Sequence, residues 1–146
     1  MQNARIAIVG AGLAGLYAAY SLEKKGIKDY VVLEAREILG GRIASTIHSD
    51  GKPDVSGVDE LELETFQQFE TGDMLLERSS NQPPERTRGY VNSPPSMRIA
   101  GGMYSMIDAL YRRIDSARVL TGQAVRHLRM SEPHVELVSE NARGET

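Results

Sequence analysis

The stretch RIAIVGAGLAGLYAAYSLEKKGIKDYVVLE, residues 5–34, contains two short apolar runs separated by a glycine-rich turn and a helical pattern. The first run, residues 5–9, is rich in β-branched side chains and ends at Gly10, as expected of a strand buried on both faces of a parallel sheet. From Leu13 the apolar side chains recur at helical spacing, and Lys24, Lys25 and Gly26 are typical of a helix end. Residues 30–34 form the second apolar run, which ends in an acid. Strand, helix and strand within about 30 residues predict a right-handed βαβ unit.

The turn GAGLAG at residues 10–15 has the spacing G-x-G-x-x-G. Gly10 allows the strand to turn sharply, Gly12 lets the backbone approach a pyrophosphate, and Gly15 lets the helix lie close to the sheet. Unpaired amides and the helix dipole favour an anion at the helix start. Glu34, at the end of the second strand, is placed to accept hydrogen bonds from ribose hydroxyls and to repel a 2′-phosphate. These features predict an α/β fold of the Rossmann type that binds the ADP half of a dinucleotide.

The sequence EAREILGGR, residues 34–42, resembles the E-A-R-x-x-x-G-G-R signature of the flavin amine oxidase superfamily, which includes amine oxidases, L-amino-acid oxidases and protoporphyrinogen oxidases. This resemblance implies FAD rather than NAD as the cofactor. It also implies that the Gly40-Gly41 loop approaches the diphosphate from the other side, that Arg42 neutralises it, and that Arg36 covers the adenosine end.

A second stretch, IAGGMYSMIDAL at residues 99–110, is similar to the G-G-M-x-x-L-x-x-A-L segment of the same family. In that family a valine on a following strand contacts the adenine edge through its backbone, and Val125 occupies the matching place. A plain core valine is the alternative at this position. The candidate cofactor-binding residues are Gly10, Ala11, Gly12, Leu13, Ala14, Gly15, Glu34, Ala35, Arg36, Gly40, Gly41, Arg42 and Val125.

Three regions are expected along the chain: a dinucleotide-binding βαβ unit at residues 1–47, a polar loop or insertion at 48–97, and a helix plus strands at 98–146 that complete the FAD-binding domain. Within the middle region, residues 59–69 are compatible with a short acidic helix that turns Leu61, Phe66 and Phe69 inward. After Gly101-Gly102, apolar side chains from Met103 to Ile114 predict about three helical turns. Strands are expected near 118–120, 125–130 and 135–138, the last two joined as a hairpin.

Composition excludes several classes of function. A formal net charge of −3, with 13 Arg and 4 Lys scattered along the chain, argues against a nucleic-acid partner. No cysteine is present, which removes disulfides and thiolate chemistry and favours the cytoplasm. The apolar run at residues 6–20 is shorter than the roughly 20 residues of a membrane-spanning helix. His48, His127 and His134 lack metal-ligand spacing, and His127 is expected to be an ordinary strand histidine.

The resemblance implies oxidation of an amine or an L-amino acid, with hydride transfer from the substrate C–H bond to flavin N5 and reoxidation by oxygen or another acceptor. It covers the cofactor-binding part of the family fold only, and the fold is therefore expected to be incomplete. We expect a complementary oxidase chain to supply the rest, and no residue is identified as a catalytic acid or base. An NAD-dependent oxidoreductase and a non-catalytic nucleotide-binding module remain the alternatives.

Overall fold

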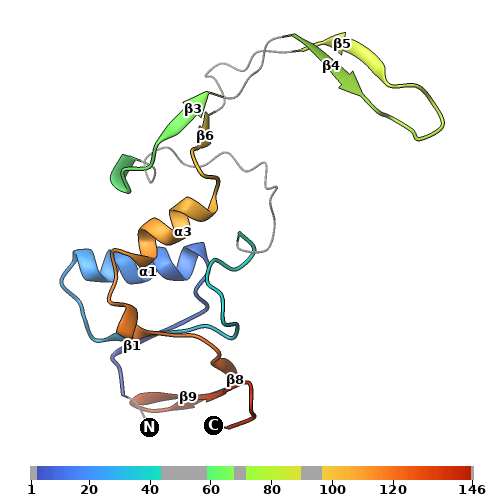
Figure 1. Cartoon of the computed structure of the whole chain (residues 1–146). Coiled ribbons are helices and arrows are strands. Elements are labelled where there is room, and N and C mark those ends of the chain that lie inside the picture. Colours follow the sequence, from blue (N-terminus) through green and yellow to red (C-terminus); the bar gives the residue numbers. More distant parts are fainter. Residues whose placement is uncertain (1–2, 44–58, 68–71, 90–96, 146) are drawn as a thin grey trace.

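A short parallel sheet and the helix that crosses it form the centre of the computed structural model, which describes residues 3–43, 59–67, 72–89 and 97–145 (Figure 1). The strands lie in the order β1-β2-β7, with β1 at Ile6–Val9, β2 at Tyr30–Leu33 and β7 at Val119–Leu120. Helix α1, Leu13–Lys24, connects β1 to β2, which pair in parallel. The predicted βαβ unit and the α/β class are confirmed.

Helix α3, Tyr104–Tyr111, packs against α1 and closes the hydrophobic core (Figure 1). It is eight residues long, shorter than the three turns predicted from the apolar pattern. After Tyr111 the backbone tightens into i→i+3 hydrogen bonds, as helix ends commonly do. The apolar pattern nevertheless marks the core correctly, because Ile114 beyond the helix end is buried. The largest fully buried side chains are Leu16, Val32, Ile107 and Leu110.

The C-terminal part carries the predicted hairpin. A short 3₁₀ helix, η1 at Ser116–Arg118, leads into β7. Strands β8, Ala124–Ser131, and β9, His134–Glu140, then pair in an antiparallel manner around a turn at residues 131–134.

Short strands also occur between residues 59 and 99, where the sequence indicated loop and one helix. Strand β3, Thr65–Gln67, pairs with β6, Met97–Ile99, and β4, Asp73–Leu76, pairs with β5, Glu85–Arg88. The β4–β5 hairpin stands away from the body of the molecule (Figure 1).

The helix expected over residues 59–69 is wrong for the described part of that stretch. Only Asp59 and Glu60 are helical, and Glu62 has a left-handed φ of 55°, which ends the helix. The next residues form β3, where Phe66 is 53% exposed rather than inward. Leu61 is buried as expected, and Phe69 lies outside the described residues. Repulsion among the carboxylates crowded between positions 59 and 64 disfavours a helix there.

Strand β1 departs from its prediction in one respect. Its pattern suggested burial on both faces, but Ala7 is exposed and Val9 is 60% exposed, while Ile6 and Ile8 pack towards the core. The reason is its position, because β1 is the edge strand of the sheet.

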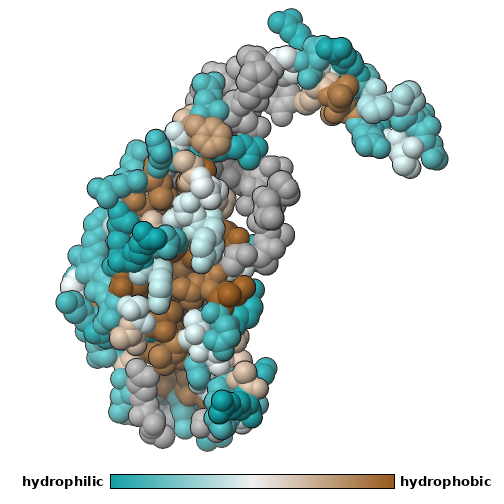
Figure 2. Space-filling model, in the orientation of Figure 1, coloured by the Kyte–Doolittle hydropathy of each residue, from teal (hydrophilic) through white to brown (hydrophobic). Residues whose placement is uncertain are grey.

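Hydrophobic surface is visible on the body of the molecule below the helices and on the outlying hairpin (Figure 2).

Among the described residues, no helix is long and apolar enough to cross a membrane. The same residues contain no cluster of three or more His, Asp or Glu side chains suited to holding a metal ion.

Candidate functional site

The glycine-rich turn joins β1 to α1 in the geometry that the spacing predicts. Gly10 has a φ of +98°, a backbone conformation that residues with a Cβ atom rarely adopt. At Gly15, a Cβ atom would lie 1.9 Å from the carbonyl oxygen of Gly10, which is far inside any allowed contact. Glycine at position 15 therefore lets α1 lie directly against the end of β1.

A second glycine loop lies beside the first. Gly40 forms an isolated parallel bridge with Gly12, and the Gly40 amide donates a 2.8 Å hydrogen bond to the carbonyl oxygen of Ala11. A Cβ on Gly41, whose φ is +59°, would lie 3.3 Å from the Cα of Gly12. The two loops thus meet backbone to backbone, which brings together the segments that the sequence assigned to the diphosphate.

Helix α1 begins without a side chain over its amides. Its N-cap is Gly12, which has no side chain to accept hydrogen bonds from the first turn. The first amides of a helix have no partner within the helix, and the helix dipole adds partial positive charge there. Ala14, in this first turn, is exposed. The N-terminal end of α1 can accordingly bind an anion without a lysine side chain.

Glu34 is fixed by hydrogen bonds from both sides. Its Oε2 accepts a 2.8 Å bond from the Ala11 amide, and its Oε1 accepts bonds from the Arg36 amide at 3.0 Å and from the Arg36 Nε at 3.4 Å. A carboxylate offers about four lone-pair positions, so Oε2 keeps one for a hydroxyl donor. The carboxylate thus links the glycine-rich turn to the end of β2 and retains capacity for a ribose.

The environment of Glu34 keeps it ionised. Burial opposes the charged form, since only 5% of the residue is exposed. The amide hydrogen bonds from Arg36 and Ala11, together with the Arg36 guanidinium, outweigh burial and lower the pKa of the Glu34 carboxyl below its ordinary value. A carboxylate at this place accepts hydroxyl donors and repels phosphate.

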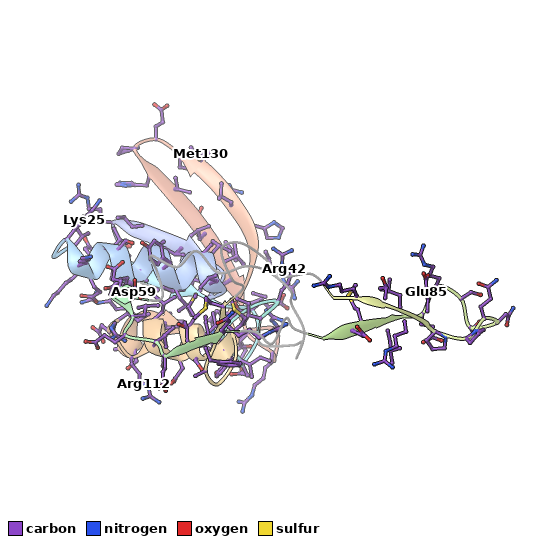
Figure 3. All side chains as sticks on the ribbon, turned by 90° about the horizontal axis from the view of Figure 1, so that it is seen from above. Lys25, Arg42, Asp59, Glu85, Arg112 and Met130 are labelled. Atoms are coloured by element: carbon purple, nitrogen blue, oxygen red, sulfur yellow. The ribbon has the colours of Figure 1, made fainter. Side chains whose placement is uncertain are left out.

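The two predicted arginines flank the second glycine loop in the sequence. Arg36 is half-exposed, and its Nη2 would lie 3.9 Å from a Cβ on Gly41, so its guanidinium stands between Glu34 and the second glycine loop. Arg42 is exposed and lies at the end where α1 begins, opposite Lys25 at the other end of the helix (Figure 3). Arg42 directly follows Gly41 in the chain, so both cations lie close to the second glycine loop.

A third segment, residues 121–123, contributes to the site and was not identified from the sequence. The Gly122 amide donates to the Arg36 carbonyl oxygen at 3.1 Å, and the Gln123 amide donates to the Glu34 carbonyl oxygen at 2.8 Å. The Thr121 hydroxyl donates to Glu37 Oε2 at 3.4 Å. Gly122, two residues after the short run at 118–120, was the available signal, because the carboxyl ends of parallel strands meet at one edge of a sheet.

The remaining predicted residues fall into two groups. Leu13 and Ala35 lie within the segments just described, the first partly buried and the second exposed. Val125 lies on β8, two residues past the bond between Gln123 and Glu34, so its role towards adenine stays a prediction. A register shift between Val125 and His127 interrupts the alternation of the strand there, and His127 is exposed.

These contacts fit a dinucleotide. Backbone without Cβ atoms, an uncapped helix start, an anchored carboxylate and two nearby guanidinium groups all lie around one edge of the sheet. This is the carboxyl edge of parallel strands, where open α/β sheets bind their ligands.

Residues 8–73 match the family model described as an NAD(P)-binding Rossmann-like domain. Tryptophan 2-monooxygenase from Pseudomonas savastanoi is 47% identical over 49 residues, which are 34% of this chain and 9% of that protein. Protein anon-37Cs of Drosophila melanogaster is 33% identical over 133 residues, which cover 83% of this chain and 25% of that protein.

Among solved structures, a redesigned putrescine oxidase triple mutant superimposes with a TM-score of 0.70 at 19% identity, covering 93% of this chain and 54% of that chain. At that identity the likeness concerns the fold alone. The chain thus spans a minor part of the curated relatives that it matches and about half of this solved one. The glycine-rich turn, the E-A-R and G-G-R residues and these relatives agree: the chain contains an NAD(P)-binding Rossmann-like domain that is similar to the nucleotide-binding part of the flavin amine oxidases.

Proposed function

We propose that this chain binds FAD by its ADP half and serves as the FAD-binding part of a flavin-dependent amine or L-amino-acid oxidase. The observation that carries the proposal is the meeting of three segments: the glycine-rich turn, the Glu34 carboxylate that accepts the Ala11 amide at 2.8 Å, and the Gly40-Gly41 loop paired with Gly12. An NAD site needs only the first two segments. In an FAD site the third segment has a role as well, because Arg36 and Arg42 beside it would together neutralise the diphosphate.

Each residue has a defined part in this proposal. The backbone at Gly12 and the first turn of α1 hold the pyrophosphate, Glu34 accepts the ribose hydroxyls, and the two arginines neutralise the phosphates. Val125 is proposed to contact the adenine edge. FAD, when bound, supplies the acceptor for a hydride from the substrate C–H bond, and oxygen or another acceptor restores it.

Substrate binding is proposed to need elements outside these residues. The solved putrescine oxidase chain matches this chain over 54% of its own length, so a full oxidase contains much that these residues do not supply. We propose that a complementary oxidase segment, such as a partner chain, provides the substrate pocket and the contacts to the flavin ring. An amine, with an L-amino acid as the first candidate, is the proposed substrate, and the cytoplasm is the proposed location.

Binding assays with the purified chain test the cofactor proposal. FAD binding is followed by quenching of flavin fluorescence, with ADP, FMN and NAD as competitors. We expect ADP to displace FAD and FMN to have no effect, because the site recognises the adenosine diphosphate half that FMN lacks. Preferential binding of NAD would favour the oxidoreductase alternative, and equal competition by FMN would contradict the assignment of the site.

A pair of variants locates the binding to the proposed carboxylate. Glu34→Gln removes the charge that faces the ribose, and we expect at least about tenfold weaker binding, equivalent to about 1.4 kcal/mol. Glu37→Gln is the matched control, since Glu37 lies in the same turn but contacts Thr121 rather than the glycine-rich turn. Equal losses in both variants would refute the role of Glu34.

A further inference from the structure

The two ends of the Gln123 side-chain amide are used differently by the fold. Its Oε1 accepts a 2.9 Å hydrogen bond from the hydroxyl of Ser139, which lies on β9. Its Nε2 carries two N–H donors, and among the described residues it donates to no acceptor. This nitrogen is not enclosed by the fold, so a ligand can reach it. Gln123 therefore presents a pair of oriented donors that the protein itself leaves unused.

The backbone of Gln123 lies beside the predicted ribose contact. Its amide donates to the Glu34 carbonyl oxygen at 2.8 Å, just past the carboxyl end of β7. Open α/β sheets bind their ligands at this edge of the parallel strands. The Gln123 side chain thus begins one hydrogen bond away from the residue that carries the carboxylate.

The side chain ends beside the residue proposed to contact adenine. Ser139 is the direct partner of Val125 across the β8–β9 hairpin. Directly opposite residues of an antiparallel pair place their side chains on the same face. The hydrogen bond to Ser139 therefore brings the Gln123 amide to the face that Val125 and Ser139 share. Gln123 links the proposed contact of the ribose to the proposed contact of the base.

A purine has the groups that these donors require. The N3 and N7 atoms of adenine are unprotonated ring nitrogens that accept hydrogen bonds. A neutral amide suits a neutral base, whereas the guanidinium groups of Arg36 and Arg42 suit the charged phosphates. The Ser139 hydroxyl occupies the amide oxygen, which leaves the donor end of the amide for the ligand.

We propose that the side-chain amide of Gln123 donates a hydrogen bond to an unprotonated ring nitrogen of adenine, and that Ser139 is the positioning residue that orients this amide. The inference rests on the proposed function, because it requires the ADP half of FAD to bind at Glu34. It adds a side-chain contact that selects the base to the contacts that hold the sugar and the phosphates. Loss of one neutral hydrogen bond should weaken binding about twofold to tenfold.

Calorimetric titration of the full chain with ADP, 3-deaza-ADP and 7-deaza-ADP tests the contact. Each analogue has a C–H group in place of one ring nitrogen. We expect one analogue to bind about twofold to tenfold more weakly than ADP and the other to bind as tightly as ADP, which identifies the nitrogen. Gln123→Leu should bind ADP more weakly by the same factor and should no longer distinguish ADP from that analogue.

Three further variants serve as controls. Gln67→Leu changes an exposed glutamine on β3 and should keep the full preference for ADP. Ser139→Ala should reduce the preference, and Ser139→Thr, which keeps the hydroxyl, should restore it. A purely structural role of Ser139 would instead weaken the binding of all three ligands equally.

Two results would overturn the proposal. In one, the unmodified chain binds ADP and both analogues equally well. In the other, Gln123→Leu prefers ADP as strongly as the unmodified chain does. Either result leaves ADP binding, and with it the proposed function, intact. If a chain shown to be folded by circular dichroism binds neither ADP nor FAD, the proposed function is rejected and the Gln123 contact is rejected with it.

Discussion

Gly12 and Gly15 lie three residues apart, and we expect them to have different roles, one in ligand binding and one in folding. A Cβ on Gly15 would lie 1.9 Å from the Gly10 carbonyl oxygen, and both partners of this contact are backbone. A Cβ on Gly12 would have Gly41 Cα as its nearest neighbour at 3.8 Å, and Gly12 has an ordinary φ of −77°. Alanine therefore fits the folded chain at position 12 and does not fit at position 15.

The magnitudes follow from these distances. For Gly15→Ala, helix α1 must move away from the end of β1 by more than about 1 Å, and forced displacements of this kind in packed regions cost about 1–3 kcal/mol or more. For Gly12→Ala, the loss of a favourable N-cap residue and the reduced entropy of the unfolded chain are each on the order of 0.5–1 kcal/mol and oppose each other. We expect its free energy of unfolding to stay within about 1 kcal/mol of the original.

Urea denaturation and FAD titration of both variants separate the two roles. Gly12→Ala should keep its unfolding midpoint but bind FAD at least about tenfold more weakly, because its Cβ occupies the approach of the pyrophosphate. Gly15→Ala should lose stability first and binding as a consequence. The reasoning is refuted if Gly15→Ala is as stable as the unmodified chain, or if Gly12→Ala remains folded and binds FAD equally well.

The remaining predictions concern Glu34, Tyr30 and Gly122. The lowered pKa of Glu34 means that the ionised carboxylate stabilises the fold above its unfolded pKa of about 4.3, and that this stabilisation is lost as the pH falls through the folded pKa. Acid unfolding of the unmodified chain should therefore include a loss of stability from the protonation of Glu34, and Glu34→Gln should lack that loss. Burial and the hydrogen bond to Glu23 raise the pKa of Tyr30, so its contribution is complete below the unfolded value of about 10 and falls above it. Tyr30→Phe should lower the free energy of unfolding by about 0.5–1.5 kcal/mol at neutral pH. Between pH 9 and 11 the variant should lose less stability than the unmodified chain, and an equal decrease of the free energy of unfolding with pH in both proteins would contradict this. Gly122→Ala places a Cβ at a φ of +65° and 2.5 Å from a flexible Glu37 carboxylate oxygen, and the backbone strain alone should cost about 1–2 kcal/mol. Adding Glu37→Ala should recover little of that loss in thermal melts, whereas full recovery would assign the cost to the carboxylate.

The N-terminal third of the fold was predictable because local rules agree there. Apolar runs, helical spacing and glycines fixed the order of β1, α1 and β2, and Glu34 marks the carboxyl end of β2. The same agreement predicted the hairpin of β8 and β9. In each case the interactions that define the element join residues close in sequence, so a single sequence contains the information.

Prediction failed where tertiary contacts decide the outcome. Strand β3 forms because β6 lies about 30 residues further on and supplies its hydrogen bonds, whereas the acidic stretch before it indicated a helix. The turn at residues 121–123 was missed because its amides bond to carbonyl oxygens of Glu34 and Arg36 across a long interval of sequence. The exposure of β1 likewise depends on what stands beside it in the sheet.

The bonds from Gly122 to Arg36 and from Gln123 to Glu34 have a thermodynamic consequence. They tie the last strand of the parallel sheet to the turn that would hold the ribose, although the two segments are more than 80 residues apart in the sequence. A dinucleotide bound at that turn would favour the closed arrangement of both segments, and a ligand at one hundred times its dissociation constant adds about 2.7 kcal/mol to the stability of the state that binds it. The nucleotide would then act as a template for late steps of folding, and the yield of native chain during refolding would depend on its concentration.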